Sequence, residues 1–585
     1  MNSSTEQVPK KPIYKTVKKI IRRKSSTASK LNQSEIDKKL SYYKRRVEYA
    51  IARGKVFRVI GNVGIGKIRL ELHKRGFIET VSNNWQNNLY NLSDIELLNK
   101  IETNNEYEMA LLTKLLGERD PDFIWINRTS SFSYYQYVAV MNKINILSCN
   151  FVVKDGLCEL IDTFRQNQPT RITDINHPRT YIVSSENYFE KFINDYRLTL
   201  ATGLILYLCN NNKKEPVEYF SCDGNISLDV LDFALKVIQI HLDRKQNYQP
   251  VIIENQESDE LNFSCLTDAL TCLTNKTGKF HLDVNDKENI ALNNETDANI
   301  ESEKLENYCN KITKVATCIL KRWPWRKHDG FTNVWLIKPA RTGEGAGILL
   351  SRDASTIKDF INRHKYKPFV IQKYLERPLL CYRTKFDFRH YFLITIDNNY
   401  FRTWSHSTAC TIKFASEQFD LQDFSEARHI TNTAVQMKYA KVSHPNLPYH
   451  HMWSLGAFIL YLNTFDKGYL WNDYIYPRMI RTIQAITEAS LNNIELTPGR
   501  FELFGCDWML TNDFRPYLLE INRCPSLEYY SPVSEIVVGK VTEDLVKVTV
   551  DYLKDKKAST GDFELIFETR LPEKISKTDD EDDEM

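Results

Sequence analysis

The stretch Asn333–Ile348, NVWLIKPARTGEGAGI, decides the fold. Its first part is rich in β-branched, aromatic and aliphatic residues, which predict a short buried strand that ends at Pro339. Lys338 stands at the end of this strand, and the turn GEGAG (343–347) follows with glycine at alternate positions. Such glycines let backbone N–H groups approach an anion closely, and a lysine beside them is placed to neutralise phosphate oxygens. A hairpin turn with an exposed lysine is the alternative that this pattern leaves open.

Length and composition are those of a globular protein. The 585 residues, of which 42% are hydrophobic and 26% charged, allow roughly two to four domains. The 12 cysteines form no C-x-x-C pair, so we expect reduced thiols rather than a zinc cluster. The chain starts without an apolar signal region, and its longest apolar run, Leu198–Cys209, is too short for a membrane span. We therefore expect neither a secretory signal nor a membrane partner.

Charge is distributed unevenly, although the net charge is only +3. Residues Lys10–Lys30 are basic and Asp579–Glu584 are entirely acidic, and both patterns are typical of solvated tails. A basic tail can also hold nucleic acid, a membrane or an acidic peptide, because charge alone does not choose among them. From about Ile253 to Glu306 polar and acidic residues dominate and aromatic residues nearly vanish, which indicates a flexible insertion.

The predicted elements divide the chain into five segments. Ser34 is expected to cap a helix that runs towards Gly54, Tyr188–Cys209 has the pattern of a strong helix, and Lys304–Trp323 is expected to form a helix after the insertion. The segments are a basic disordered tail (1–33), an N-terminal α/β domain with a helical region (34–250), the acidic flexible insertion (251–306), a catalytic core (307–555) and an acidic C-terminal tail (556–585).

The segment Gly61–Lys67, GNVGIGK, has to be tested as a phosphate-binding loop. It matches most of the pattern G-x-x-x-x-G-K-[ST] and follows a predicted strand. Ile68 replaces the Ser/Thr that should ligate Mg²⁺, and no partner strand that ends in a metal-binding Asp is evident. A glycine turn that leads into an amphipathic helix explains the segment as well.

Charged side chains alternate along the predicted strand Thr384–Ile396. Lys385, Asp387 and Arg389 share one face by the period of two, and phenylalanines occupy the other face. Three charges of mixed sign on one face favour the floor of a polar pocket. An exposed strand edge with ion pairs is the alternative.

A second polar group lies on a hairpin formed by Phe501–Leu510 and Arg515–Asn522. Glu520 and Asn522 alternate onto the same face, and Asp507 is on the other strand. Oxygen ligands without histidine or cysteine suit Mg²⁺, and buried carboxylates are costly unless they are paired or bound to metal. We therefore favour a metal site over a surface hairpin.

Several motifs in this order resemble the tubulin–tyrosine ligase-like family, whose catalytic core has an ATP-grasp fold. The motifs are Lys338-Pro with its glycine turn, Gln372-Lys-Tyr, Lys385-Phe-Asp-Phe-Arg, His429-Ile-Thr-Asn, Phe501-Glu-Leu-Phe-Gly-Cys-Asp and Leu519-Glu-Ile-Asn-Arg-Cys-Pro. The upstream half is similar to the glycylase branch in Lys55-Val-Phe-Arg-Val-Ile-Gly, Lys74-Arg-Gly-Phe-Ile-Glu, Asp122-Phe-Ile-Trp, Asn176-His and Phe192-Ile-Asn-Asp-Tyr-Arg. The resemblance implies an α/β (α+β) protein, with an ATP-grasp core that follows an N-terminal α/β domain.

The resemblance also implies a role for each matching residue. Nucleotide would contact Lys338, Glu344, Gly345, Gln372, Lys373, Tyr374, Leu375, Lys385 and Asp387, with Lys338 and Lys373 on phosphates and residues 372–375 beside adenine. Mg²⁺, or Mn²⁺ in its place, would be held by Asp507, Glu520 and Asn522. The catalytic residues would be Arg389, which faces the reacting acyl phosphate, and Lys413.

Two positions depart from the family pattern. The family usually has Ser-Arg-Gly-x-Gly-Ile in the glycine turn, so that a basic side chain is replaced here by Glu344, which repels nucleotide unless metal or Arg341 compensates. Lys413 stands where the family usually has arginine, and lysine keeps the charge but loses the two-pronged hydrogen bonding. We hypothesise slow turnover, or substitution by Arg341.

The resemblance predicts an ATP-dependent ligase that adds glycine to glutamate side chains of tubulin C-terminal tails through an acyl phosphate. Free glycine would be the co-substrate, and Lys10–Lys30 or Lys321–Lys327 would hold the acidic tail. We expect a monomer that binds microtubules but no nucleic acid, located in the cytoplasm, the cytoskeleton and the axoneme of cilia or flagella. The alternatives are a polyglutamylase of the same fold, a catalytically weak microtubule-binding relative, and a P-loop NTPase.

Overall fold

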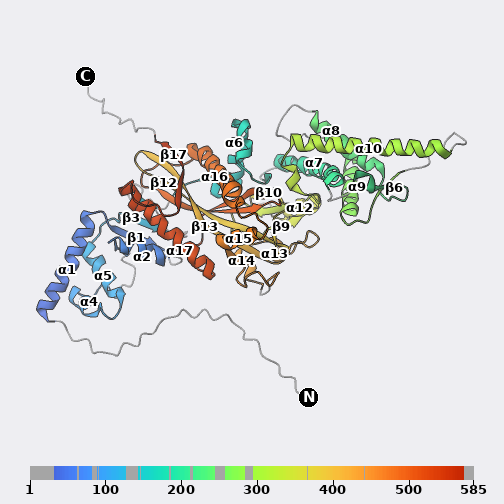
Figure 1. Ribbon diagram of the computed structural model, residues 1–585. Helices are drawn as coiled ribbons and strands as arrows, with labels where there is room; N and C mark the ends of the chain where they lie inside the picture. Colours follow the sequence, from blue (N-terminus) through green and yellow to red (C-terminus); the bar gives the residue numbers. More distant parts are fainter. Residues whose placement is uncertain are drawn as a thin grey trace, which may run out of the picture. The chain divides into compact units, whose positions relative to one another are not determined.

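The computed structural model describes residues 32–61, 65–81, 89, 91–126, 143–144, 147–183, 186–210, 215–243, 257–282, 294–364, 367–439 and 442–571 (Figure 1). The predicted basic tail, except its last two residues, and residues 572–585 of the predicted acidic tail lie outside these residues. The described part of the predicted acidic tail is not a tail throughout, because it contains strand β17 (Phe563–Arg570). The chain forms two compact units: Met1–Arg58 with His73–Asp122, and Val59–Leu72 with Phe123–Met585. The domain boundary predicted at residue 250 does not coincide with this division.

The first unit is built around helix α1 (Gln33–Ala52). Its N-cap is Asn32, which forms a reciprocal capping box with Glu35, so the start predicted at Ser34 is two residues late. Ile36, Val47 and Ala50 form the buried face of α1. That face packs in the apolar clusters of helices α4 (Asp94–Lys100) and α5 (Asn105–Leu116), and strand β1 (Val56–Ile60) pairs in parallel with β2 (Ile78–Glu79).

The second unit contains a large antiparallel sheet in the order β14-β13-β12-β15-β16, with β11 paired to β12 and β17 to β13. The strands predicted at Thr384–Ile396 and Phe501–Leu510 are confirmed within these bounds as β12 and β15. The remaining strands are β11 (Leu380–Cys381), β13 (Tyr400–Gln418), β14 (Met452–Ser454), β16 (Pro516–Arg523) and β17 (Phe563–Arg570).

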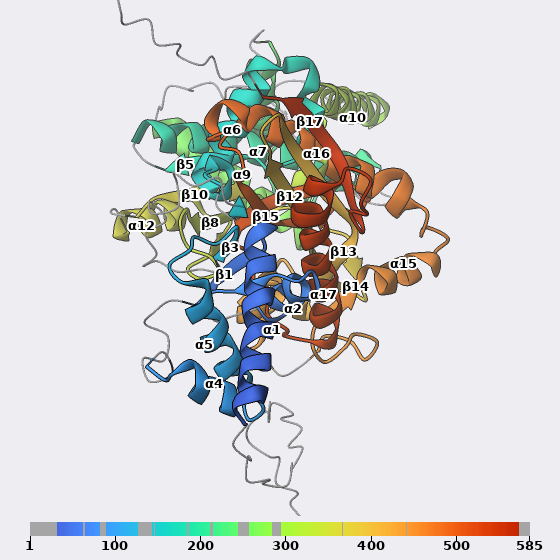
Figure 2. The ribbon, with the colours of Figure 1, turned by 90° about the vertical axis from the view of Figure 1, so that its left-hand side faces the viewer.

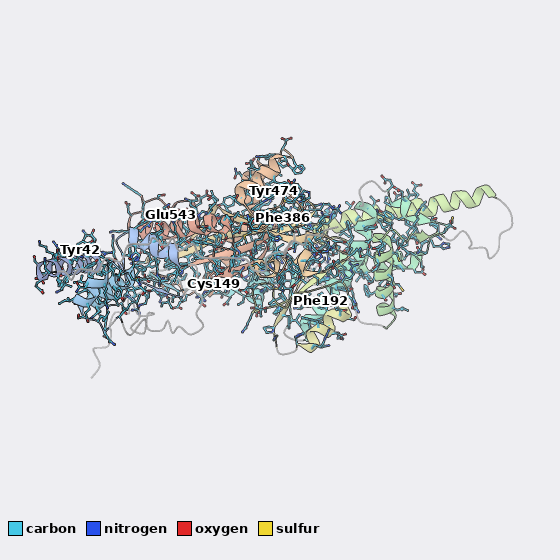
Figure 3. All side chains as sticks on the ribbon, turned by 90° about the horizontal axis from the view of Figure 1, so that it is seen from below. Tyr42, Cys149, Phe192, Phe386, Tyr474 and Glu543 are labelled. Carbon is cyan, nitrogen blue, oxygen red and sulfur yellow. The ribbon has the colours of Figure 1, made fainter. Side chains whose placement is uncertain are left out.

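One face of the large sheet forms the main hydrophobic core. The even-numbered apolar residues of β12, including Phe386 and Phe388, pack against side chains of α6 (Lys154–Asn167), α15 (Leu455–Asn463) and α16 (Tyr476–Ser490). Figure 2 shows β12 and these helices as ribbons, and Figure 3 labels Phe386. Because side chains alternate along a strand, the odd-numbered Lys385, Asp387 and Arg389 belong to the opposite face. The same alternation that builds the core therefore collects charged groups on the other side.

A smaller antiparallel sheet has the order β5-β10-β8-β9. Its strands are β5 (Thr180–Val183), β8 (Trp335–Pro339), β9 (Leu349–Ser351) and β10 (Phe369–Lys373), and side chains of α7 (Glu186–Asn210) and α12 (Ala354–Arg363) pack on it. β8 runs antiparallel to β10, with Leu336 opposite Gln372 and Lys338 opposite Val370. The strand predicted around Lys338 is thus confirmed: it ends at Pro339 as expected and starts at Trp335 rather than at Asn333.

The helical region differs from the predicted flexible insertion. Residues Glu257–Thr274 form helix α9, and Phe263, Leu266 and Leu270 are buried against α7 and α8 (Leu228–Leu242). The helix predicted at Lys304–Trp323 is α10 (Asn294–Arg322), which starts ten residues earlier. The segment is polar overall, and this composition hid the apolar residues that recur in it at helical spacing. Those residues form the buried face of α9. Residues 251–256 and 283–293 lie outside the described part of the chain.

The other described elements, most of them short, complete the structure. They are α2 (Gly66–Lys74), α11 (Arg326–Asp329), α13 (Glu426–His429), α14 (Thr433–Gln436), α17 (Pro532–Val546), β3 (Phe123–Ile126), β4 (Lys143–Ile144), β6 (Phe220–Ser221), β7 (Phe280–His281), η2 (Asn150–Val152), η3 (Pro169–Asp174), η4 (Pro216–Tyr219), η5 (Trp471–Ile475), η6 (Leu491–Asn493) and η7 (Lys547–Tyr552). No helix in these described segments combines the length and the hydropathy of a bilayer-spanning segment.

Candidate functional site

The second unit has a cleft of ≈ 740 Å³, including space open to solvent, lined by residues of β8 and β10 and of β12, β15 and β16. Eleven of the predicted site residues line it: Lys338, Glu344, Gly345, Gln372, Lys373, Tyr374, Leu375, Lys385, Asp387, Asp507 and Glu520. The other three, Arg389, Lys413 and Asn522, each donate a hydrogen bond to Asp507. All the predicted site residues therefore converge, although they span almost 200 positions of sequence.

The cleft has an apolar part and a charged part. Its apolar lining includes Leu336, Ile348, Leu375, Met509 and Leu519. The charged lining comes from β8, β10, β12, β15 and β16, with Lys154 from α6 and Glu344 from the glycine turn. A flat base needs the first kind of surface and a polyphosphate the second, so the arrangement suits a nucleotide.

Lys338 is held at the cleft by a polar chain of contacts. Its Nζ donates to Oε1 of Gln372 at 2.7 Å, and Nε2 of Gln372 donates to Oγ1 of Thr180 at 3.0 Å. His177 also lies 3.4 Å from Gln372 Nε2, and burial lowers the pKa of His177 to about 3, so the imidazole is neutral. Burial likewise lowers the pKa of Lys338 to about 8, an effect that the Glu520 carboxylate partly offsets.

The position of Lys373 in the motif implies that its side chain contacts phosphate, but the structure engages that side chain elsewhere. Its Nζ is fully buried and donates to Oε1 of Glu376 at 2.8 Å and to the carbonyl oxygens of Asp329, Val334 and Tyr374 at 2.9 Å each. An ammonium group with this many acceptors has no proton left for a ligand. Lys373 therefore secures the end of β10.

The glycine turn adopts the left-handed backbone that its composition predicts. Gly345 has φ +78°, and a Cβ at this position would lie 2.9 Å from Cγ2 of Ile430, so only glycine fits. Glu344 also has a positive φ of +64°, which is unusual for a residue with a side chain. Its exposed carboxylate belongs to the cleft lining. Glu344, the acidic residue that stands where the family usually has a basic one, therefore lies at the cleft.

Lys385 lies under the ring of Tyr374, with Nζ 5.1 Å from the ring centroid. Its ammonium group donates to the carbonyl oxygen of His429, and burial lowers its pKa to about 7. The hydroxyl of Tyr374 and Nδ1 of His429 are 2.8 Å apart. The His429-Ile-Thr-Asn motif therefore forms one wall of the cleft beside Lys385.

The carboxylates form an ion network centred on Asp507. Arg389 donates to both of its oxygens, from Nε at 2.8 Å and from Nη2 at 2.9 Å. Nζ of Lys413 lies 3.3 Å from Oδ1 of Asp507 and 3.1 Å from Oδ1 of Asp387. Burial opposes ionisation of Asp507, but Arg389 and Lys413 outweigh it and hold the pKa of this carboxyl well below its usual range. The network keeps Asp507 ionised.

The residues predicted to hold a metal fit Mg²⁺ by their donor chemistry. Glu520 lies directly opposite Asp507 in the hairpin, and Nδ2 of Asn522 is 3.2 Å from Oδ2 of Asp507 and 3.3 Å from Oε1 of Glu520. Two carboxylates and a carboxamide at the edge of a polar cleft offer the oxygen ligands that Mg²⁺ prefers. Glu520 is also partly exposed, so its oxygens are accessible from the cleft.

Three residues at the site were missed as individual site residues. Thr431 donates to Oδ2 of Asp387 at 2.7 Å and so orients that carboxylate. Lys154 donates to the carbonyl oxygen of Thr342 at 2.8 Å and lies 3.6 Å from Oε2 of Glu520. Gly505 leaves room for Arg389, since a Cβ there would lie 2.9 Å from Cδ of Arg389. Thr431 belongs to the recognised motif His429-Ile-Thr-Asn, whereas no motif in the sequence around Lys154 points to this role.

The P-loop candidate has a different environment. Nζ of Lys67 forms ion pairs with Glu71 at 3.1 Å and Glu543 at 3.6 Å, and α2 starts at Gly66. Residues 62–64 lie outside the described part of the chain. A lysine held by two carboxylates is a poor phosphate ligand, so the structure favours the predicted alternative of a turn and an amphipathic helix.

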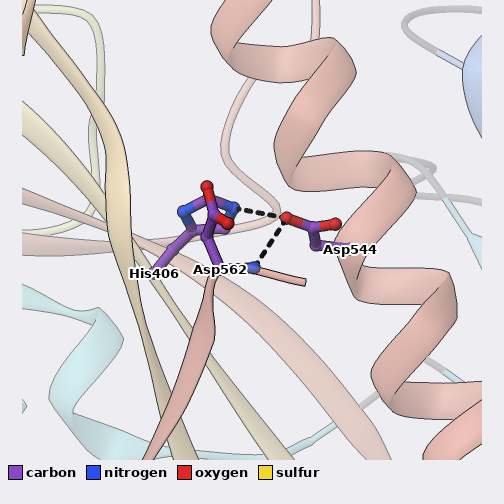
Figure 4. Close-up of side chains that lie close together, drawn as sticks. All are labelled: His406, Asp544 and Asp562. Carbon is purple, nitrogen blue, oxygen red and sulfur yellow. Dashed lines mark hydrogen bonds and ion pairs between the residues drawn. The ribbon is translucent and has the colours of Figure 1, made fainter. Parts of the chain in front are cut away.

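A histidine–carboxylate cluster away from the cleft is formed by His406, Asp544 and Asp562 (Figure 4). Nδ1 of His406 accepts from the Ala409 N–H at 3.0 Å, so in the neutral ring the proton is on Nε2, which lies 3.3 Å from Asp544. Asp544 also has lysine partners, Lys547 at 2.8 Å and Lys540 at 3.1 Å. Two ammonium groups neutralise this buried carboxylate, so the cluster is explained without a metal ion.

The buried lysines predict that nucleotide binding depends on pH. Lys338 and Lys385 have pKa values of about 8 and about 7, and an anionic ligand favours their protonated forms. Affinity is therefore expected to fall as the pH rises from 7 to 9, with proton uptake on binding near pH 8. Calorimetry in buffers of different ionisation enthalpy measures this uptake, and Lys338→Met should reduce it. Binding without proton uptake near pH 8 would contradict the assignment of these lysines.

Comparison with known proteins adds independent findings. Residues 271–558 match the model of the tubulin-tyrosine ligase family. The chain is 29% identical to tubulin glycylase 3B of Drosophila melanogaster over 90% of this chain and 68% of the relative, and 29% identical to tubulin glycylase 3A of the same organism over 80% and 47%. It is 27% identical to protein monoglycylase TTLL8 of Mus musculus over 93% of this chain and 66% of the relative. The chain thus spans about half to two thirds of the length of these relatives.

Proposed function

We propose that the chain belongs to the tubulin–tyrosine ligase family, whose model its residues 271–558 match, and that it is an ATP-dependent carboxylate–amine ligase that attaches glycine to glutamate side chains of tubulin tails. The ATP-grasp core expected from the family is confirmed as a mixed α/β structure. One observation carries the proposal: Lys338 and Lys385 line the same cleft as Asp507 and Glu520.

The proposed chemistry follows from the need to activate a carboxylate. ATP phosphorylates the glutamate side chain, and the amine of glycine then attacks the acyl phosphate and releases phosphate. Lys338 and Lys385 bind phosphate oxygens, while Asp507, Glu520 and Asn522 hold Mg²⁺, which neutralises phosphate charge when bound. Asp507 occupies Nε and Nη2 of Arg389 and leaves Nη1, with which Arg389 contacts the reacting acyl phosphate. No cysteine or histidine nucleophile is required.

We favour glycine over other amino acids as the co-substrate because the relatives named above are two tubulin glycylases and a monoglycylase. The test supplies purified tubulin, Mg²⁺ and ATP with labelled glycine or labelled glutamate. We expect label transfer from glycine only, and none when ATP is omitted. Transfer from glutamate instead would assign the chain to the polyglutamylases and overturn the proposal. The proposed setting is the cytoplasm and the microtubules of cilia or flagella.

The carboxylate of Glu344 favours a second candidate, a weakly active relative that mainly binds microtubules. Its position in the glycine turn brings a negative charge to the cleft that is proposed to take phosphates. In this candidate tubulin binding persists while ATP-dependent label transfer is absent.

The variant Glu344→Arg is expected to raise the ligation rate about tenfold, because it replaces repulsion of phosphate oxygens by attraction. Glu344→Gln, which only removes the charge, should give an intermediate rate. Initial rates of label transfer at limiting ATP measure both effects. If neither variant exceeds the wild-type rate, repulsion by Glu344 does not limit turnover.

A further inference from the structure

Helix α1 of the first unit has an exposed stripe of alternating cationic and aromatic residues. The α1 stripe consists of Lys38, Tyr42, Arg45, Tyr49 and, at the C-cap, Arg53. These residues are separated by four, three, four and four positions, which places them within about 80° of the helix circumference. Tyr42 and Tyr49 are 55% and 50% exposed, which is high for large aromatic side chains. Figure 3 labels Tyr42. The stripe is therefore a continuous surface feature.

The opposite face of α1 anchors the helix and accounts for its orientation. Ile36, Val47 and Ala50 are buried, and the half-buried Tyr43 packs with them. Burial of this face satisfies the amphipathic pattern of the helix without using the stripe. The ring of Tyr42 also contacts that of Tyr43, with centroids 5.2 Å apart, but Tyr42 and Tyr49 both remain half exposed, so packing within the unit uses only part of these aromatic surfaces.

The cations of the stripe differ from Lys39 and Arg46, which flank the stripe on one side, whereas Lys44, on another side of α1, also has no ion pair among the described residues. On the flanks of the helix, Lys39 forms an ion pair with Glu102 at 3.1 Å and Arg46 with Glu108 at 2.6 Å. Among the described residues, Lys38, Arg45 and Arg53 have no ion pair. The guanidinium of Arg53 instead stacks 3.7 Å from the ring centroid of Tyr49. This stacking orders the cation while its charge stays available for a partner.

We propose that the α1 stripe is a docking surface for an acidic polypeptide segment. Tyrosine and arginine are the residues enriched at protein-binding hot spots, and the stripe supplies both in alternation. It extends along roughly 22 Å of helix, which matches about seven residues of extended chain. Given the proposed function, on which this assignment rests, the segment is an acidic C-terminal tail of tubulin.

Protein is favoured over nucleic acid by the small number of unpaired cations. Nucleic-acid binders of moderate affinity contact about six to ten phosphates, whereas the stripe offers three cations and flanking carboxylates at Asp37 and Glu48. The stripe also replaces one predicted docking surface, the basic cluster Lys321–Lys327. Arg326 of that cluster is buried against Asp195, and Lys327 is paired with Asp513 at 2.6 Å.

The test measures binding of the full chain to microtubules by co-sedimentation, without ATP or glycine. The stripe variant is Tyr42→Ala/Arg45→Glu/Tyr49→Ala/Arg53→Glu, and a milder variant, Arg45→Gln/Arg53→Gln, guards against misfolding. The control, Lys314→Glu/Lys358→Glu, makes the same change in charge at exposed positions of α10 and α12. Circular dichroism confirms that each variant is folded. A second set of microtubules has its acidic tails removed by limited proteolysis.

The stripe variant is expected to raise the dissociation constant at least about tenfold, the milder variant less, and the control not at all. Removal of the tails should weaken the wild type to the level of the stripe variant. Wild-type affinity in the folded variants, or undiminished binding to tail-free microtubules, would overturn the proposal, as would an RNA that binds the stripe more tightly than a polyglutamate peptide. Because binding is measured without turnover, the docking result does not depend on the outcome of the ligase assay.

Discussion

The variant Asp507→Ala is expected to abolish ATP-dependent ligation and to lower the free energy of unfolding by about 3–5 kcal/mol. Both effects come from one carboxylate, which accepts two hydrogen bonds from Arg389 and one from Lys413. Its removal leaves the Arg389 guanidinium buried without its partner. It also takes one oxygen ligand from the proposed Mg²⁺ site.

Denaturant unfolding and label transfer measure the two effects separately. The double variant Asp507→Ala/Arg389→Met also removes the unpaired guanidinium, while Lys413 keeps its ion pair with Asp387 at 3.1 Å. It should recover part of the lost stability and none of the activity. If Asp507→Ala retains ligase activity, Asp507 does not belong to the reaction centre.

The variant Glu520→Gln is expected to lower activity at least about a hundredfold with little effect on stability. Glu520 is 20% exposed, and its contacts with Lys154 at 3.6 Å and Asn522 at 3.3 Å are weak ones. Loss of such contacts changes the free energy of unfolding by less than about 1 kcal/mol. The lost negative charge acts instead on the metal, so the Mg²⁺ concentration that gives half-maximal rate should rise.

A titration of the ligation rate against Mg²⁺ tests this expectation. Glu535→Gln, an exposed glutamate of α17, is the matched control and should leave the titration unchanged. If Glu520→Gln lowers the rate without changing the Mg²⁺ dependence, Glu520 has another role. A variant as unstable as Asp507→Ala would show that Glu520 is a structural residue.

Sequence reasoning succeeded where one local pattern determines both the element and its faces. The alternation in β12 predicted its bounds and the shared face of Lys385, Asp387 and Arg389. The predicted strand Phe501–Leu510 is β15, and it places Asp507 opposite Glu520 on β16. In both strands, side chains alternate between the two faces of the sheet. Once the apolar residues are assigned to the core, the polar residues must therefore lie on the opposite face.

It failed where the environment of a side chain comes from distant segments. The motif around Lys373 implies a phosphate ligand, but the carbonyl oxygens that hold its ammonium group come from residues 329, 334 and 374. Lys154 reaches Glu520 from far upstream in the sequence. Helix α9 was concealed by polar composition, because only its buried stripe carries the signal.

Calorimetric titration of the purified chain with a non-hydrolysable ATP analogue and Mg²⁺ tests the central claim most directly. The account predicts one site whose affinity is lost in Lys338→Ala and unchanged in Lys67→Ala, because Lys338 lines the cleft of Asp507 and Glu520 whereas Lys67 is paired with Glu71 and Glu543. Binding that survives Lys338→Ala and is lost in Lys67→Ala would contradict it and assign the nucleotide to the segment Gly61–Lys67.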